Sequence, residues 1–210
     1  MMSPSPRCST KTSDCGRLVM YLLPALSPDA IPVIETDRFR LRANTLDDFQ
    51  PMFDMWQTPA FYEHIGGKPR PSGYLWSQLQ KNIGSWALFG FGYWTIADLE
   101  TDRFIGECGF TLSKRSEINP PLKNIPEAGW GIHPDYWGKG YTKAAMSAAL
   151  DWALSQDPDF PCQCIINEGH RASEAVARSL GMTIVRTVAF DGDEDEPVNV
   201  WENVTAARAS

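Results

Sequence analysis

A strand pattern, a short glycine-containing loop and a helix pattern follow one another directly in residues 127–155. A second strand–helix pair comes next along the chain. The predicted elements are, in order, the strand EAGWGI (127–132), a helix from about Lys139 to Ser155, the strand CQCIIN (162–167) and the helix RASEAVARSL (171–180). Strands joined through a helix become parallel neighbours in a sheet. These residues therefore predict parallel strand pairing in the second half of the chain.

The rest of the chain predicts antiparallel pairing. The remaining predicted elements are the strand FRLRA (39–43), a helix over LDDFQPMFDMWQ capped by Asn44 or Thr45, a helix starting at Ser72, the strands GYWTIADLE and RFIGECGFTL joined by a turn at Glu100–Asp102, and the strands TIVRTVAF and VNVWENV around the acidic turn DGDEDEP. The resulting order β, α, α, β, β, β, α, β, α, β, β predicts an α+β fold. Its sheet has mixed direction, is largely antiparallel, has six to seven strands and is flanked by helices.

Composition limits the classes of function. With 210 residues, of which 43% are hydrophobic, residues 31–210 are long enough for a single domain. Residues 1–30 are rich in Ser and Pro and lack a sustained period, which predicts a disordered extension. The net charge of −7 argues against nonspecific binding to nucleic acid or to an anionic membrane. No apolar run approaches the roughly 18 residues of a transmembrane helix.

The five cysteines are odd in number and irregularly spaced, which indicates a reducing compartment, with the cytoplasm as the default. Basic and Ser residues in the extension faintly indicate mitochondrial targeting, which Asp14 and the prolines weaken. Cys162 and Cys164 have no second Cys/His pair at zinc-site spacing, so we expect two buried side chains and no metal site.

The loop 137-WGKGYTKAA-145 predicts an anion site. The amides of Gly138 through Lys143 would lie at a helix N-terminus, which carries about half a positive charge, and Lys139 and Lys143 add cations. The spacing does not fit a P-loop, because no Gly precedes a Lys-Ser/Thr pair as that motif requires. A dinucleotide fingerprint needs a third glycine where Lys143 stands. A phosphate or diphosphate group is therefore the expected ligand.

Four tracts resemble the GNAT N-acetyltransferases, and in particular their ribosomal-protein alanine acetyltransferase (RimJ/RimL-like) branch. The loop is similar to the family's Gln/Arg-x-x-Gly-x-Gly/Ala motif, with Trp137, Gly140 and Thr142 at its defined positions. The other tracts are TDRFRLRANTLDDF (36–49), GECGF (106–110) and HRASEAVARSLGM (170–182). They occur in the family's order and cover about residues 35 to 204.

The resemblance implies acetyl-CoA as co-substrate, no metal, and a sheet whose central strands splay apart to admit pantetheine. The residues implied in binding the cofactor are Ile132, Trp137, Gly138, Lys139, Gly140, Tyr141, Thr142, Lys143 and His170. The chain also departs from the family pattern. His170 stands where the family has Asn, Ala144 stands where Glu is common, and no tyrosine follows Tyr141 to act as the family's usual acid.

Acetyl transfer to an amine requires a group that accepts the amine proton, since a free lysine has a pKa near 10. Glu127 begins the strand that ends at the loop, and Glu107 lies on the neighbouring strand, so they are the first and second candidate bases. Both also fit solvated carboxylates at the edge of a sheet. Ser173 matches the family's signature serine near the thiol, or else bonds the backbone in the first turn of its helix.

The sequence thus predicts an N-acetyltransferase that acetylates an amine by direct attack in a ternary complex. The alternative is a catalytically silent CoA-binding module used for regulation or interaction, which the departures from the pattern leave open. A nucleotide-phosphate binder is a third possibility. The acceptor, whether a protein N-terminus or a small-molecule amine, and the oligomeric state are left open by the sequence.

Overall fold

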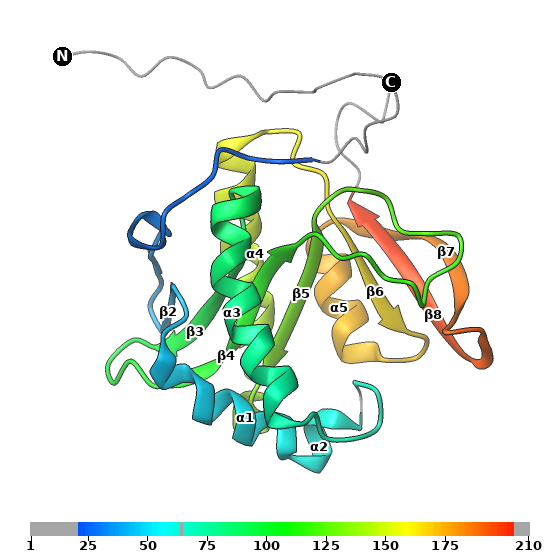
Figure 1. The fold of residues 1–210 in the computed structure, drawn as a ribbon, viewed down its shortest axis with the longest axis horizontal. Coiled ribbons are helices and arrows are strands. Elements are labelled where there is room, and N and C mark those ends of the chain that lie inside the picture. Colours follow the sequence, from blue (N-terminus) through cyan, green and yellow to red (C-terminus); the bar gives the residue numbers. More distant parts are fainter. Residues whose placement is uncertain (1–20, 64, 204–210) are drawn as a thin grey trace.

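The computed structural model describes residues 21–63 and 65–203, which form one sheet with helices on both faces (Figure 1). The strands are β1 (Ile34–Glu35), β2 (Phe39–Arg42), β3 (Tyr93–Asp98), β4 (Phe104–Thr111), β5 (Glu127–Ile132), β6 (Gln163–Asn167), β7 (Met182–Phe190) and β8 (Asp193–Asn203). The helices are α1 (Phe49–Gln57), α2 (Pro59–Tyr62), α3 (Ser72–Phe89), α4 (Tyr141–Gln156) and α5 (Arg171–Ser179). Short 3-10 turns cover Pro28–Ala30, Leu46–Asp48 and Pro134–Tyr136.

The sheet has the order β1-β2-β3-β4-β5-β6-β8-β7. Every neighbouring pair is antiparallel except β5 and β6, which are parallel. The predicted mixed, largely antiparallel α+β fold is confirmed. The structure has eight strands instead of six to seven because the two residues of β1 pair with β2, and two residues are too few to show a strand pattern.

The two faces of the sheet differ in chemistry. Trp94, Cys108, Phe110 and Cys164 contribute to an apolar core that packs against α4 and α5. On the opposite face, buried polar side chains follow one another across the strand register: Thr95 opposite Glu107, Thr111 opposite Glu127, then Gln163 and Glu202. Because α3 donates a hydrogen bond to Glu107, this polar face lies under α3. Burying polar groups costs free energy unless they are paired. Because proteins tolerate such a cost mainly at functional sites, we expect this face to contribute to function.

Local sequence signals placed most element ends correctly. Helix α3 starts at Ser72 as predicted, and Gly181 follows α5 with a φ of +72°. Thr45 caps the turn before α1 through a reciprocal capping box with Asp48. Helix α4 starts at Tyr141, two residues later than predicted, because Gly140 has a left-handed conformation that cannot continue a helix.

The acidic segment between the last two strands was predicted as a turn through Pro197, which is wrong. Asp191 and Gly192 have φ values of +53° and +80°, and Phe190 pairs with Asp193. Two consecutive positive φ values form the tight hairpin turn that the twist of antiparallel strands favours. The strand β8 therefore begins already at Asp193.

Part of the segment that precedes residue 31 contacts the domain. Residues 1–20 lie outside the described part of the chain, but Tyr21 and Leu23 are ordered against the domain. The Tyr21 hydroxyl donates to Asp157 at 2.6 Å, and the Leu23 amide donates to Phe89 O at 2.8 Å. This part of the chain is therefore held by residues that are distant in the sequence. None of the helices in residues 21–63 and 65–203 has the length and apolar character needed to cross a membrane.

Candidate functional site

The strands β5 and β6 separate almost as soon as they meet. Their parallel register contains a single pair, Glu127 with Gln163, supported by the bond from Gln163 N to Pro126 O at 2.9 Å. His133 N bonds to Ile105 O on the side of β4. Because main-chain groups alternate in direction along a strand, the N–H and C=O of Trp130 point away from β4, into the gap. The gap opens into a cavity of about 830 Å³.

The loop after β5 and the start of α4 form one wall of this cavity. Gly138 and Gly140 have φ values of +71° and +79°, and both line the cavity together with Tyr141, Thr142 and Lys143. In the described part of the chain no side chain caps α4, and its first main-chain bond runs from Ala144 N to Gly140 O. The preceding amides of the first turn are therefore left for another acceptor. Five predicted cofactor residues thus meet at an uncapped helix N-terminus.

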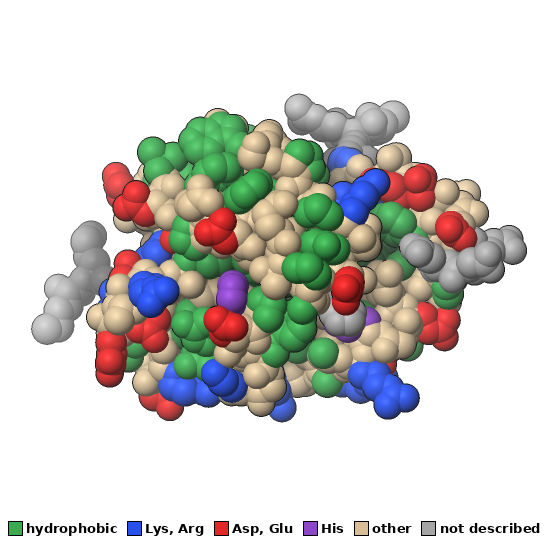
Figure 2. Space-filling view, turned by 90° about the horizontal axis from the view of Figure 1, so that it is seen from below, with side chains coloured by type: hydrophobic (Ala, Val, Ile, Leu, Met, Phe, Trp, Pro, Cys, Tyr) green, Lys and Arg blue, Asp and Glu red, His purple; other side chains and the backbone are tan. Residues whose placement is uncertain are grey.

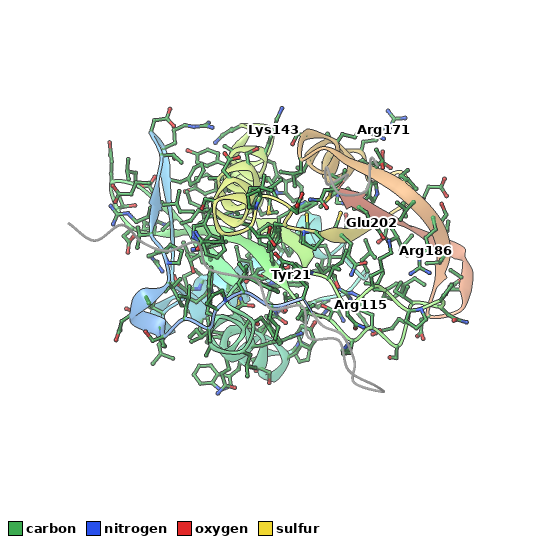
Figure 3. The ribbon with its side chains drawn as sticks, turned by 90° about the horizontal axis from the view of Figure 1, so that it is seen from above. Tyr21, Arg115, Lys143, Arg171, Arg186 and Glu202 are labelled. Atoms are coloured by element: carbon green, nitrogen blue, oxygen red, sulfur yellow. The ribbon has the colours of Figure 1, made fainter. Side chains whose placement is uncertain are left out.

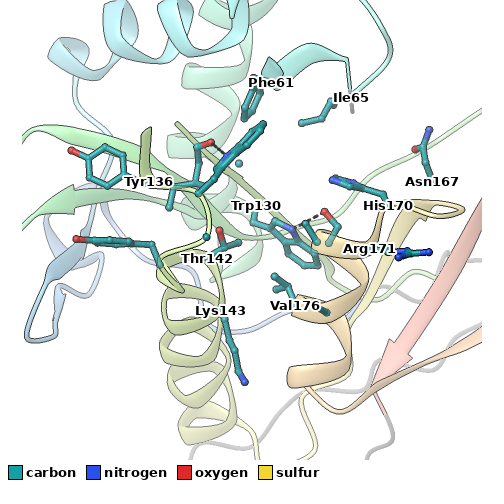
Figure 4. A pocket seen from close by; sticks show the side chains of 18 of the residues that line it. Phe61, Ile65, Trp130, Tyr136, Thr142, Lys143, Asn167, His170, Arg171 and Val176 are labelled. Atoms are coloured by element: carbon teal, nitrogen blue, oxygen red, sulfur yellow. Dashed lines mark hydrogen bonds between the residues drawn. The ribbon is translucent and has the colours of Figure 1, made fainter. Parts of the chain in front are cut away.

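The loop is held by its own side chains. The Trp137 indole donates to Ile132 O at 2.8 Å, so the last carbonyl of β5 is already bonded inside the protein, although both residues line the cavity. The Lys139 ammonium donates to Asp135 O at 2.7 Å and lies 5.6 Å from the Tyr136 ring centre. Lys139 is consequently turned back onto the loop, whereas Lys143 lies at the cavity wall (Figure 4).

The N-terminus of α5 forms the facing wall. His170, Arg171 and Ser173 line the cavity, as Figure 4 shows for the first two. The Ser173 hydroxyl accepts a hydrogen bond from the Trp130 indole at 3.3 Å, which ties α5 to β5 across the gap. Lys143 and Arg171 lie along the same edge of the molecule, on the opposite side of the sheet from Arg115 (Figure 3). The positive charge of the cavity thus gathers on the face of α4 and α5.

Seen from the end at which the loop and α2 lie, apolar side chains are exposed across the middle of the surface and basic side chains lie along one edge (Figure 2). Phe61 and Ile65, from α2 and the segment after it, join the cavity lining beside Glu63. The cavity lining therefore includes apolar side chains and Glu63 near α2, and Lys143, Glu168 and Arg171 near the N-termini of α4 and α5. In the described residues, no cluster of three or more His, Cys, Asp or Glu side chains is arranged to hold a metal ion.

The first candidate base, Glu127, is ion-paired. Arg115 Nε lies 2.9 Å and 3.0 Å from its two carboxylate oxygens, and the side chain of Glu127 is only 7% exposed. Glu127 lies at the closed end of the gap and does not line the cavity. The bidentate pair uses both oxygens, so this carboxylate is available mainly as a fixed negative charge.

The second candidate base, Glu107, is buried and has no cationic partner among the residues that the structure describes. Burial raises its pKa from 4.5 to about 7, although the Asn82 amide, donating at 3.1 Å, opposes that increase. Glu107 lies opposite Gly131, which lines the cavity, and the side chains of Phe61 and Met55 cover Gly131. Glu107 therefore lies on the strand beside a cavity-lining residue but does not itself line the cavity.

Sequence reasoning missed Tyr93, which lies on the same polar face. A Cβ on Gly129 would fall 1.8 Å from the Tyr93 hydroxyl, so the absence of a side chain at Gly129 makes room for this group. Burial, followed by the charges of Glu127 and Glu107, raises the pKa of Tyr93 well above its usual value. The alternate glycines of GECGF and EAGWGI were the available signal, because glycine inside a strand marks a close approach.

Comparison with known proteins identifies a family. Residues 38–183 match the model of an acetyltransferase (GNAT) domain. The uncharacterized protein YkkB of Bacillus subtilis is 25% identical over 172 residues, which cover 80% of this chain and 92% of that protein. The crystal structure of an acetyltransferase from Agrobacterium tumefaciens has 26% identity and a TM-score of 0.67, covering 88% of this chain and 98% of its own. The structure of RimL, a ribosomal L7/L12 alpha-N-protein acetyltransferase in complex with coenzyme A, has 16% identity and a TM-score of 0.65, covering 84% and 99%.

Proposed function

Because the chain belongs to the GNAT acetyltransferase family, we propose that it transfers the acetyl group of acetyl-CoA to an amine by direct attack in a ternary complex. One observation carries this proposal: the gap between β5 and β6 leads to the uncapped N-terminus of α4 within a single cavity. An extended chain that ends in a diphosphate matches that shape, since helix N-termini bind anions through free amides.

The residues present fit coenzyme A as the donor. The amides from Gly138 to Lys143 would hold the diphosphate, and Lys143 on that wall and Arg171 on the facing wall add local positive charge. The main chain of Trp130, unpaired on the side of the gap, would bond the pantetheine amides. When bound, the donor supplies an acetyl thioester, and the residues of the cavity orient that thioester.

The acceptor amine would enter from the polar face and the end near α2. We assign the role of proton acceptor to Glu107, acting through water, because its pKa of about 7 suits a base that works near neutral pH. Glu127, held by Arg115, favours a positive charge at the attacking nitrogen without taking its proton. The Ser173 hydroxyl accepts from Trp130 and keeps its own hydrogen to donate toward the departing sulfur.

The test is release of thiol from acetyl-CoA, followed with a thiol reagent over a panel of protein N-termini, polyamines and small amines. We expect one acceptor class to give turnover, and Glu107→Gln to lower kcat by about a hundredfold. Glu100→Gln, an exposed carboxylate in the β3–β4 turn, serves as the matched control and should leave kcat unchanged. Glu127→Gln, measured alongside, should affect kcat less than Glu107→Gln does.

Tight CoA binding with no thiol release for any amine would instead assign the chain as a silent CoA-binding module. Greater stabilisation by ATP or NAD than by CoA would favour a nucleotide-binding role. The thiols of Cys108, Cys162 and Cys164 are free and buried, so we further propose that the enzyme works in the reducing cytoplasm.

A further inference from the structure

Arg38 contacts the loop between β5 and α4 from outside the cavity. It follows β1 in a turn that Thr36 fixes, since the Thr36 hydroxyl accepts from Arg38 N at 3.3 Å and from Phe39 N at 3.1 Å. Arg38 lies 101 residues before the loop, does not line the cavity, and has a side chain that is 40% exposed. Nothing in the proposed reaction uses it directly.

Two contacts place the Arg38 guanidinium around one peptide of the loop. Its Nη1 donates to Lys139 O at 2.9 Å, and its Cζ lies 4.7 Å from the centre of the Tyr141 ring. Phe39 packs against the same ring at 6.0 Å between centroids. Arg38 therefore contacts the residue before Gly140 and the residue after it, which brackets the glycine where the chain turns into α4.

The geometry of the peptide bond links this contact to the cavity. In a trans peptide the C=O of one residue and the N–H of the next point in opposite directions. Holding Lys139 O toward Arg38 therefore directs the Gly140 N–H away from Arg38, and Gly140 lines the cavity. Glycine at a φ of +79° offers little resistance to a flip of this peptide, so an outside contact is needed to fix its direction.

We propose that Arg38 is a positioning residue that fixes the Lys139–Gly140 peptide so that the amides at the start of α4 converge on the diphosphate of coenzyme A. This inference rests on the proposed function. It gives a physical role to the first arginine of the TDRFRLR tract, which the reaction itself leaves without one. A planar guanidinium that bonds a carbonyl while stacking on an aromatic ring is a contact that lysine cannot reproduce.

The test is calorimetric binding of CoA and of pantetheine, which lacks the diphosphate, to the full chain. We expect Arg38→Ala to weaken CoA binding about tenfold and to leave pantetheine binding unchanged. Arg38→Lys keeps the charge and should recover less than half of that loss on a logarithmic scale. Arg40→Ala is the matched control, because it removes the same charge two residues away, where Arg40 pairs with Glu35 and Asp102. In turnover, KM for acetyl-CoA should rise in Arg38→Ala with kcat retained.

Each outcome decides the question. Equal CoA affinity in wild type and Arg38→Ala overturns the inference and leaves the proposed function standing. An equal loss for CoA and pantetheine also overturns it, because that result indicates a general disturbance of the cavity. Full recovery of CoA affinity in Arg38→Lys, or an equal loss of CoA affinity in Arg40→Ala, would mean that only the positive charge matters. Either result rejects the positioning role. Absence of CoA binding to wild type overturns both proposals. If Arg38→Ala proves unfolded, Arg38→Lys carries the same comparison.

Discussion

Replacing Glu107 by Gln should stabilise the protein at neutral pH and at the same time lower its activity. Glu107 is 5% exposed, has no cationic partner among the described residues, and accepts a hydrogen bond from Asn82. Burial raises the pKa of this carboxyl from 4.5 to about 7, so the folded protein keeps the proton at pH values where the unfolded chain has released it. Gln has nearly the same shape and can still accept the bond from Asn82.

The magnitude and sign follow from proton linkage. A difference between 4.5 and about 7, at about 1.4 kcal/mol for each pH unit, corresponds to roughly 3 to 4 kcal/mol. Because the folded-state pKa is the higher one, this stability is fully present below pH 4.5 and is lost as pH rises to about 7. The free energy of unfolding of Glu107→Gln minus that of wild type should therefore increase by roughly 3 to 4 kcal/mol between pH 4.5 and pH 8.

Urea unfolding followed by tryptophan fluorescence measures this difference at several pH values, with Glu100→Gln as an exposed control. The contributions of other titrating groups cancel in the subtraction. A difference that stays constant with pH, or one that decreases, would refute the assignment of Glu107 as a buried neutral acid. A pH-dependent gain in stability with kcat unchanged would keep that assignment and reject Glu107 as the proton acceptor.

Three further predictions concern the neighbouring contacts. Arg115→Ala should lower the free energy of unfolding by about 2 kcal/mol, because it leaves the buried Glu127 without its partner, and thermal unfolding against Arg115→Lys checks this. Gly129→Ala should cost about 2 kcal/mol, since its Cβ would fall 1.8 Å from the Tyr93 hydroxyl, and adding Tyr93→Phe should recover part of that loss in a double-mutant cycle. Gly140→Ala should destabilise by about 1 kcal/mol because of its φ of +79° alone, as no atom lies within 4 Å of the new Cβ, and a larger loss would contradict this reading.

Much of the fold could be predicted because it depends on near neighbours in the sequence. The turn at Glu100–Asp102 joins β3 and β4 as expected, and the glycine after α5 ends that helix in the predicted conformation. The glycines between Trp137 and Lys143 and the helix that follows them predict an anion site, and in the structure this segment lines the cavity apart from Lys139. Periodicity, capping and backbone freedom are local properties, so a single sequence displays them.

The environments of the candidate catalytic groups could not be predicted from the sequence. Glu107 and Glu127 look alike in the sequence, since each is on a strand beside the loop. Among the described residues, however, Glu107 is buried with no cation beside it, whereas Glu127 is paired with Arg115. Arg115 comes from a polar loop that offered no pattern to interpret, and Tyr93 lies on a strand whose alternation indicated only burial. The environment that separates the two carboxyl groups is made by residues from other strands and helices.

The sequence by itself determined the order of strands and helices, the glycine loop before α4 and the family to which these features point. Only the tertiary structure decided that β5 and β6 separate after a single pair, that Arg38 holds a carbonyl 101 residues away, and that Tyr93 fills the space above Gly129. The physical reason is the sequence separation over which each kind of interaction acts. Dihedral preferences and hydrophobic period act over a few residues, whereas packing and electrostatic contacts join groups that only the folded sheet brings together.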